Sequence, residues 1–265
     1  MIKIIASDLD GTLLHHGEQT LNEELFPLIR KLKEKGVLFV AASGRQYPNL
    51  RRLFAPVADD IAYICENGAL MVYKGQILHK SIMDKETGRK LIRDIISRRD
   101  CEALVSGENT SYIQPKQDSY RRLLADTVKN NVMIVEDLEK IPEDYIKISV
   151  FNQFGITLEL EEALKSTFQD ILEPAVSGLA WMDFVSKGTN KGTALSILKE
   201  KLQVSKNETV VFGDNYNDIE CLMEARYSYV MENARDEIKK YGNFTCENVE
   251  KIMKDFLLDF DETIS

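Results

Sequence analysis

Two aspartates separated by one residue, Asp8 and Asp10, directly follow the short apolar run at residues 2–7. Alternate side chains of an extended segment point the same way, so both carboxylates are expected on one side of the chain. One of them could attack phosphorus and form an aspartyl-phosphate, which is a known form of covalent catalysis. The other could protonate the leaving oxygen and then activate water. Aspartate pairs are also common in turns and caps, so the pair needs partners to indicate catalysis.

Further carboxylates that could hold a cation follow a second apolar run, at residues 209–212. The segment GDNYND that comes next contains Asp214 and Asp218. Together with Asp8 they would supply the hard oxygen ligands that Mg²⁺ prefers. A magnesium ion there would neutralise part of this acidic cluster and part of a bound phosphate.

Other polar residues have the chemistry to bind the phosphate itself. The Ser43 hydroxyl and the backbone N–H of Gly44 could contact phosphate oxygens after a predicted strand. Lys191 begins a predicted helix, where the ammonium and the helix N-terminus both favour an anion. Asn217 can donate a side-chain hydrogen bond. Each residue alone is more typical of a turn, a solvated helix start or a cap, so their shared location decides the interpretation.

The elements that would position these residues alternate between short apolar strands and amphipathic helices. Strands are predicted at residues 2–7, 37–42, 61–65, 209–212 and 227–231, and helices at 22–35, 191–202, 216–225 and 248–259. Continuous apolar strands in β-α-β alternation predict an α/β fold with a Rossmann-like parallel sheet and helices on both faces. Ligands of such sheets bind beyond the carboxyl ends of the strands, where the polar clusters are predicted to lie.

The middle of the chain has a different pattern. Its predicted strands, 101–105, 132–135 and 145–151, alternate partly between apolar and polar residues, with helices predicted at 86–99, 119–130 and 157–172. Mixed elements with half-exposed sheets are typical of a separate small unit. We therefore expect a catalytic core formed by residues 1–81 and 186–265, interrupted by an inserted α/β cap at 82–185.

Composition narrows the classes of protein further. The 265 residues are 44% hydrophobic and 29% charged, with a formal net charge of -9, which argues against a nucleic-acid partner. No apolar run approaches the roughly 20 residues that a membrane-spanning helix needs. The four cysteines are far apart without a CxxC pair, which favours reduced thiols and a cytoplasmic location. The sequence does not indicate an oligomeric state.

Taken together, these motifs resemble those of a known superfamily. The chain contains DLDGTLL at Asp8–Leu14, ASGR ending at Arg45, a helix opening at Lys191 and GDNYND at Gly213–Asp218. In this order they resemble the four motifs of the haloacid dehalogenase superfamily. The form ASGR, ENGA at Glu66–Ala69 and SKGTNKGTAL at Ser186–Leu195 resemble its Cof-type branch, subclass IIB. The middle of the chain matches by length and position only, and Cys221 replaces a methionine that is frequent after the last motif.

The resemblance implies a role for each motif residue. Asp8 would be nucleophile and magnesium ligand, and Asp10 would be the general acid and base, ligating the metal through its backbone carbonyl. Ser43 and Lys191 would hold the transferring phosphoryl group, which Asn217 would also contact. The remaining carboxylates would serve the metal: Asp214 as a ligand, and Asp218 as a support for the metal or its waters. The cap would close over the site and select the substrate.

The resemblance therefore implies a Mg²⁺-dependent phosphatase of small phosphorylated metabolites, such as sugar phosphates, nucleotides or phosphorylated cofactors. A phosphosugar mutase that uses the same aspartate and a non-catalytic phospho-ligand sensor stay as alternatives. A P-loop enzyme is disfavoured because no GxxxxGK[ST] occurs.

The sequence assigns several other residues less clearly. Arg45 and Asn67 could contact the ligand or only connect loops, and Trp181 is expected to pack rather than to recognise substrate. The adjacent His15 and His16 make a poor chelating pair for one ion. Charged runs such as 199–201 are expected to be solvated.

Overall fold

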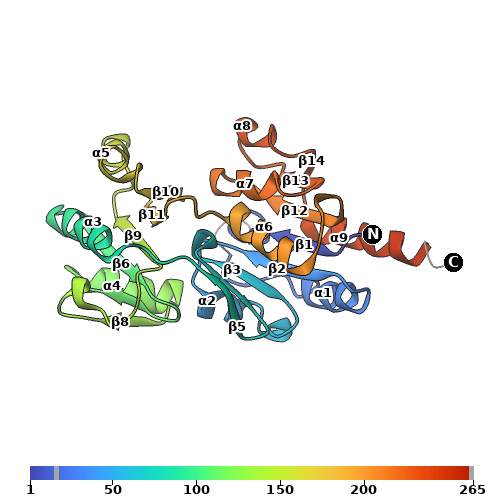
Figure 1. Cartoon of the computed structure of the whole chain (residues 1–265), viewed down its shortest axis with the longest axis horizontal. Helices are drawn as coiled ribbons and strands as arrows, with labels where there is room; N and C mark the ends of the chain where they lie inside the picture. The colour runs from blue at the N-terminus through green and yellow to red at the C-terminus, as the bar shows by residue number, and fades with distance from the viewer. Residues whose placement is uncertain (15–17, 263–265) are drawn as a thin grey trace.

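The computed structural model describes residues 1–14 and 18–262 and contains two β-sheets, each with its own helices. In Figure 1 the eight-stranded sheet lies on the right together with both chain termini, and the six-stranded sheet lies on the left with α3, α4 and α5. Two connections join the sheets. The two connections lie side by side where the hydroxyls of Ser81 and Thr189 are 2.8 Å apart.

The larger sheet contains the strands on which the predicted site depends. Its strand order is β14-β13-β12-β1-β2-β3-β4-β5. The strands are β1 (Ile4–Ser7), β2 (Leu38–Ala42), β3 (Ala62–Cys65), β4 (Leu70–Tyr73), β5 (Gln76–Lys80), β12 (Thr209–Gly213), β13 (Tyr227–Met231) and β14 (Phe244–Cys246). The six from β14 to β3 run parallel, while β4 and β5 form an antiparallel hairpin at one edge. The central strands β1 and β12 are fully buried, as their continuous apolar runs predict.

Helices cover both faces of this sheet. One hydrophobic cluster joins α1 (Leu25–Glu34), α2 (Tyr47–Leu53) and α9 (Val249–Glu262) to one set of strand side chains. The alternate strand residues pack on the other face against α6 (Lys191–Leu202), α7 (Ile219–Leu222) and α8 (Asp236–Lys239). Two-sided coverage of a mainly parallel sheet confirms the predicted α/β fold.

The smaller sheet is formed by the middle of the chain, in the order β10-β11-β9-β6-β7-β8. Its strands are β6 (Cys101–Ser106), β7 (Ser111–Ile113), β8 (Val132–Ile134), β9 (Lys147–Asn152), β10 (Leu172–Ser177) and β11 (Trp181–Ser186). Helices α3 (Lys85–Ser97) and α5 (Leu158–Phe168) pack on one face. The other face contacts α4 (Asp118–Arg122) and the π-helix η3 (Leu123–Val128). Where the unit begins and ends, predicted at residues 82 and 185, stays a prediction.

The face of the smaller sheet that contacts α4 and η3 is less exposed than the alternation of apolar and polar residues in its strands predicted. All six residues of β6 are buried, and Ser149 of β9 is only 2% exposed. In register across the sheet, Leu104, Ser149 and Asp183 stand side by side. The polar positions of this face bond to groups of both units: Asp183 accepts from Asn67, and Glu102 accepts from the Lys116 and Gln117 backbone N–H groups. The expected half-exposed sheet was therefore wrong here.

Local differences concern the shorter helices and one charged run. The helix predicted at 216–225 is a 3₁₀ turn, η6 (Tyr216–Asp218), followed by the four-residue α7. The side chain of Asp218 turns back to the N–H groups of Asp214 and Asn215, which favours the tight turn. Lys199 is 6% exposed because it bonds to Glu224, so its predicted solvation was wrong. No helix in the described residues is long and apolar enough to cross a bilayer.

Candidate active site

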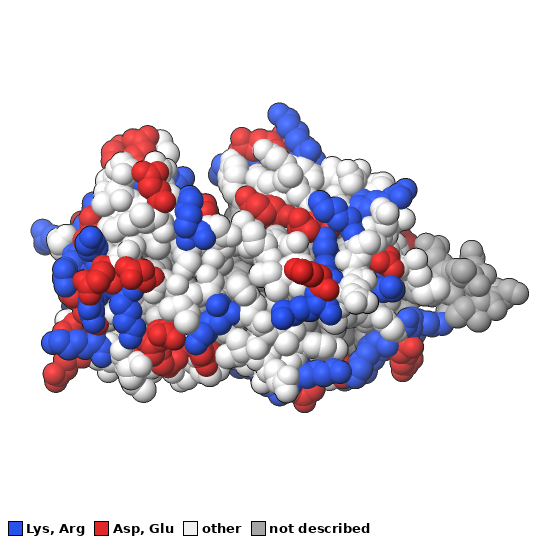
Figure 2. Space-filling view, in the orientation of Figure 1, with Lys and Arg blue, Asp and Glu red and all other residues white. Residues whose placement is uncertain are grey.

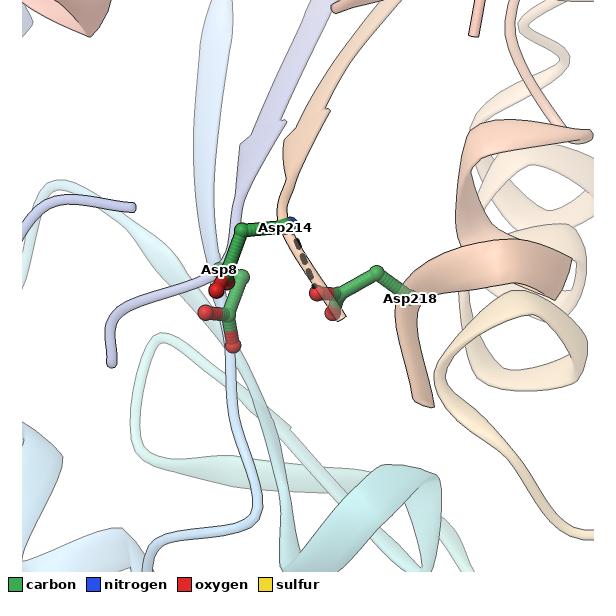
Figure 3. Close-up of side chains that lie close together, drawn as sticks. All are labelled: Asp8, Asp214 and Asp218. Carbon is green, nitrogen blue, oxygen red and sulfur yellow. Dashed lines mark hydrogen bonds between the residues drawn. The ribbon is translucent and has the colours of Figure 1, made fainter. Parts of the chain in front are cut away.

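Three carboxylates meet at the carboxyl end of the larger sheet. Asp8 follows β1 and Asp214 follows its hydrogen-bonded neighbour β12, while Asp218 comes from η6. One oxygen from each lies within 4.8 Å of the other two. Figure 3 shows the carboxylates of Asp8 and Asp214 next to one another, with Asp218 turned back toward the backbone N–H of Asp214. The structure thus brings together the three side chains expected to hold a cation.

Lys191 is the cation that the protein itself places in this cluster. Its Nζ donates to Asp8 Oδ1 at 2.6 Å and to Asp218 Oδ1 at 2.7 Å. The lysine is the first residue of α6, and a capping box between Asn190 and Thr193 sets where that helix begins. The Lys191 side chain is 1% exposed, so its charge serves the site and not the solvent.

Burial and mutual repulsion shift the pKa values of the carboxylates in the cluster. Burial, followed by repulsion from Asp218, raises the pKa of Asp8 well above its ordinary range. The same two causes raise the pKa of Asp214 to about 6. Burial lowers the pKa of Lys191, but Asp218 and Asp8 outweigh that effect, and the ammonium is held protonated. Carboxylates that resist ionisation together in this way favour an added cation.

The turn after β1 lets these groups approach closely. Gly11 has a φ of +99°, and a Cβ atom there would lie 2.1 Å from Asp214 Oδ2. Thr12 Oγ1 donates to Asp214 Oδ1 at 3.0 Å, which orients that carboxylate. A glycine is needed at this position both for its backbone conformation and for the space.

Asp10, the second aspartate, is held by Arg45 and not by the carboxylate cluster. Arg45 Nε and Nη2 donate to the two Asp10 oxygens at 2.8 and 2.5 Å. Such a two-point pair fixes the orientation of the carboxylate. Arg45, which the sequence left undecided between ligand contact and loop contact, thus acts on a predicted catalytic group.

Three of the predicted phosphate-binding residues, Ser43, Gly44 and Asn217, line the same cavity as Asp8 and Asp10. Ser43 directly follows β2 and is 1% exposed, with its Oγ accepting from the Arg45 backbone N–H at 3.2 Å. Gly44 follows it, and Asn217 reaches the cavity from η6. The Asn217 Nδ2 donates to Asn67 Oδ1 at 3.2 Å, which connects this residue to the loop after β3.

A cavity of about 400 Å³ extends from the aspartates to the face of the smaller sheet. Both units line it. The larger unit contributes Asp8, Asp10, Ser43, Gly44, Arg45, Gln46, Glu66, Asn215 and Asn217, and the smaller contributes Leu104, Ser106, Leu124, Val128, Asn130, Lys147, Ser149, Ser177, Gly178, Trp181 and Asp183. Trp181 packs on Phe151, with ring centroids 4.8 Å apart, as expected, but it also forms part of the cavity wall.

Sequence reasoning missed a buried charged group between the two units. Lys147 Nζ of β9 lies 2.6 Å from Glu66 Oε2 and 3.3 Å from Asp183 Oδ2, and it donates to the backbone carbonyl of Gly44 at 2.7 Å. Asp183 also accepts from Ser149 at 2.6 Å and from Asn67 at 2.8 Å. The available signal was a lysine in the mainly apolar strand IKISVF, where a buried charge needs a partner of opposite charge. His15 and His16 lie outside the described residues.

The match to known proteins covers nearly the whole chain. A family model described as haloacid dehalogenase-like hydrolase matches residues 5–252. A 5-amino-6-(5-phospho-D-ribitylamino)uracil phosphatase of Escherichia coli (strain K12) is 30% identical over 88% of this chain and 86% of its own. A crystal structure from Eubacterium rectale has a TM-score of 0.85 and 31% identity, covering 96% of this chain and 99% of that one. A subclass IIB sugar phosphatase shares the fold, with a TM-score of 0.81, 22% identity, and 96% and 98% coverage.

Proposed function

The chain belongs to the haloacid dehalogenase-like hydrolases, and from this premise we propose that it is a magnesium-dependent phosphatase. It would hydrolyse small phosphate monoesters by way of an aspartyl-phosphate on Asp8. One observation carries the proposal: the Asp8 carboxylate lies buried between the Lys191 ammonium and two further carboxylates. That arrangement combines a nucleophile with a cation for the phosphate and a place for a metal.

The donor set fits a magnesium ion. Oxygens of Asp8, Asp214 and Asp218 converge, and burial together with repulsion from Asp218 raises the pKa values of Asp8 and Asp214, which an added cation would offset. Magnesium prefers hard oxygen ligands of this kind and keeps several of its waters. When bound, the ion would supply charge stabilisation for the transferring phosphoryl group. In this proposal Asp8 and Asp214 ligate the metal, the Asp10 backbone carbonyl adds a ligand, and Asp218 ligates it or orients its waters.

Each of the protein's own groups has a defined task. Lys191 holds Asp8 with one oxygen engaged at 2.6 Å and offers its charge to the phosphoryl oxygens. Ser43, the Gly44 backbone and Asn217 bind the remaining phosphoryl oxygens. Asp10, held at both oxygens by Arg45, donates a proton to the leaving alkoxide and then accepts one from the attacking water. Asp8 and Lys191 are buried away from bulk water, which strengthens the interactions between them and the phosphoryl group.

The substrate would be a small phosphorylated metabolite, with specificity set by the inserted unit that we propose at residues 82–185. The cavity of about 400 Å³ limits the leaving group to the size of a sugar, a nucleoside or a related heterocycle. The Escherichia coli relative is named for 5-amino-6-(5-phospho-D-ribitylamino)uracil, so that compound is the first substrate to test, followed by sugar phosphates and nucleotides.

The test is release of inorganic phosphate from a panel of monoesters, with and without magnesium, by the wild type and by Asp8→Asn. We expect metal-dependent release by the wild type and at least a roughly 10³-fold loss in the variant, because an amide cannot attack phosphorus. The variant should keep its thermal transition, since the substitution retains shape and removes one charge from a repelling cluster. Substantial turnover by folded Asp8→Asn would refute the mechanism.

A further inference from the structure

Asn67 connects residues of both units at the carboxyl end of the larger sheet. It is 3% exposed and is not among the residues that line the cavity. Its Nδ2 donates to Asp183 Oδ2 in the smaller unit at 2.8 Å, and its Oδ1 accepts from Asn217 Nδ2 in the larger unit at 3.2 Å. The two ends of one buried amide therefore connect a carboxylate of the smaller unit with a proposed phosphate ligand.

The backbone fixes where this amide lies. Asn67 has a φ of 54° and a ψ of 34°, in the left-handed region that asparagine adopts more readily than most residues do. Its N–H donates to the Ser43 carbonyl at 3.1 Å. A Cβ atom at Gly44 would lie 3.0 Å from Asn67 Oδ1, so the side chain packs directly against the loop after β2. The Asn67 amide therefore has little freedom to move away from the proposed phosphate-binding groups.

Asp183 determines which end of the Asn67 amide faces it. The Asp183 carboxylate also accepts from Ser149 at 2.6 Å and from Ser177 at 3.2 Å, and it lies 3.3 Å from Lys147 Nζ. A carboxylate surrounded by donors acts only as an acceptor. The Nδ2 of Asn67, and not its Oδ1, must therefore point at Asp183.

The orientation of Asn67 in turn determines that of Asn217. The Asn67 Oδ1 faces Asn217, and an amide oxygen can only accept a hydrogen bond. Asn217 must therefore present its Nδ2 to Asn67, as the bond at 3.2 Å shows. That nitrogen carries two hydrogens, so one remains for a phosphoryl oxygen in the cavity that Asn217 lines. With the amide reversed, an oxygen would stand in place of this nitrogen and repel the phosphoryl group.

We propose that Asn67 is a positioning residue through which Asp183 of the smaller unit orients the Asn217 amide, so that an N–H and not a carbonyl oxygen meets the phosphoryl group. The inference rests on the proposed function for the role of Asn217 as a phosphate ligand. It gives Asn67 neither of the tasks that the sequence left open, because the residue acts on the ligand only through Asn217. It also makes phosphate affinity depend on a carboxylate that an anion would not bind directly.

The first test measures binding of inorganic phosphate by calorimetry in the presence of magnesium. Inorganic phosphate has no leaving group, so contacts between a leaving group and the smaller unit cannot affect the result. We expect Asn217→Ala to weaken binding at least about tenfold, because a hydrogen bond to a charged group is lost. Asp183→Asn should weaken it at least about fivefold, because an amide can face Asn67 with either end.

A double-mutant cycle shows whether Asp183 acts through Asn217. In the Asn217→Ala background, Asp183→Asn should weaken phosphate binding by less than about a further twofold, because the amide that Asp183 orients is absent. If Asp183 served only to hold the fold together, the substitution would cause the same loss in both backgrounds. That result would overturn the proposal.

Exchanging the two side chains provides a rescue that a purely structural role does not predict. In the double variant Asn67→Asp with Asp183→Asn, the carboxylate at position 67 can accept from the amides at positions 183 and 217. Asn217 would again present its Nδ2, and aspartate tolerates the left-handed backbone at position 67. The double variant should therefore bind phosphate more tightly than either single variant. Independent losses would make it the weakest of the three and would contradict the proposal.

Asn49→Ala is the matched control. Asn49 is likewise a buried asparagine of the larger unit, and its Nδ2 donates to the Val128 carbonyl of the smaller unit at 2.6 Å. Its other side-chain bonds go to Asn130 and Arg45, which are not proposed phosphate ligands. This variant should lower the Tm and change phosphate affinity by less than about twofold. A loss of phosphate affinity equal to that of Asp183→Asn would show that any contact between the units has this effect, and the special role of Asn67 would be refuted.

The outcomes separate this inference from the phosphatase proposal. Phosphate binding with the expected pattern among the variants, but no turnover of any monoester by the wild type, supports the role of Asn67 and refutes the phosphatase. Turnover of monoesters together with a phosphate affinity that Asp183→Asn leaves unchanged supports the phosphatase and overturns the role of Asn67. A wild type that binds no phosphate overturns the inference, because Asn217 is then not a phosphate ligand.

Discussion

At the scale of single residues, the site depends on one buried lysine shared by two carboxylates. Lys191 bonds to Asp8 and Asp218 at 2.6 and 2.7 Å, and all three side chains are at most 7% exposed. Removing one member of such a group leaves the others buried without compensation. The same contact that orients the proposed nucleophile therefore also stabilises the fold.

We expect Lys191→Met to lower turnover by at least about 10³-fold, since the phosphoryl group loses its cation. The free energy of unfolding in urea should fall by about 3 kcal/mol without magnesium, and added magnesium should restore part of it. Lys199→Met is the matched control. Lys199 is on the same helix, is also buried and bonds to Glu224 away from the cavity. Lys199→Met should destabilise the protein while its kcat/KM is retained. Retained turnover in Lys191→Met would contradict the role that we assign to Lys191.

Magnesium affinity should depend on pH through Asp214. Its pKa is raised to about 6 in the metal-free protein by burial and by Asp218, against an ordinary value of about 4. Below pH 6 a proton competes with the metal, so the Kd for Mg²⁺ should increase by at least about tenfold per unit of falling pH. Above pH 6 the contribution of Asp214 is complete, and any further rise in affinity comes from Asp8, whose pKa is also raised. Calorimetric titrations of Mg²⁺ between pH 5 and 8 measure this, and a flat profile would speak against it.

The free energy of unfolding of the metal-free protein should depend on pH with the opposite sign, because it should fall as the pH rises from 4 to 6. Folded Asp214 binds its proton more tightly than unfolded Asp214 does, so the folded state holds more protons between pH 4 and 6. Its contribution to the free energy of unfolding therefore falls as pH rises through this window. Saturating magnesium, which neutralises the ionised carboxylate, should cancel the loss when unfolding is followed at each pH.

At the scale of elements, helix termini position the chemistry. The capping box at Asn190 and Thr193 determines where α6 begins and hence where Lys191 projects. Gly68 supports the same junction, because with a φ of +98° a Cβ there would lie 2.2 Å from the Asn190 carbonyl oxygen. The loop after β3 and the start of α6 are therefore packed against each other without room for a side chain.

We expect Asn190→Ala to lower the free energy of unfolding by about 1 kcal/mol, the usual cost of losing an N-cap. It should also reduce kcat several-fold, because a frayed first turn displaces Lys191. Thr157→Ala removes the corresponding cap of α5 in the smaller unit, where the Thr157 Oγ1 accepts from the Leu160 N–H at 3.2 Å. That variant should show a similar stability loss with unchanged kcat. Equal losses of kcat in Asn190→Ala and Thr157→Ala would contradict a special role for the first turn of α6.

At the scale of the whole molecule, polar contacts around the cavity join the two units. Besides Lys147, Asn49 of α2 donates to the Val128 carbonyl at 2.6 Å, and Arg52 donates to the Lys129 carbonyl at 2.7 Å. Figure 2 shows acidic and basic side chains interspersed over one outer face, with a mostly uncharged stretch where the units meet. Among the charged groups that join the units, Lys147, Glu66 and Asp183 are buried, whereas Arg52 is exposed.

Removing the buried charge at this junction should uncouple the units. Lys147→Met leaves Glu66 and Asp183 without their shared cation, so the free energy of unfolding should fall by about 3 kcal/mol. KM for large substrates should also rise, because the smaller sheet no longer docks on the Gly44 carbonyl. Lys187→Met removes a half-exposed lysine paired to Glu173 and should change either quantity little. Denaturant titration and steady-state kinetics compare the two variants, and equal effects would contradict the docking role.

The sequence by itself determined the chemistry at the edge of the larger sheet. Asp8, Ser43 and Asp214 each follow a short apolar run, and parallel strands place their carboxyl ends together whatever the connections between them do. The spacing of apolar residues also predicted α6 and β13 at their observed bounds, and it predicted that most strands of the larger sheet run parallel. The hairpin of β4 and β5 and the short strands β7 and β14 are too brief to stand out by periodicity.

Only the tertiary structure decided the far side of the cavity. Lys147 reaches the Gly44 carbonyl across 103 residues, and Asn67 reaches Asp183 across 116. No motif or spacing in the sequence predicts either contact, because the partners meet only when the two sheets face one another. Motifs determine local chemistry through strand geometry, whereas specificity arises from contacts between surfaces whose relative position no single segment encodes.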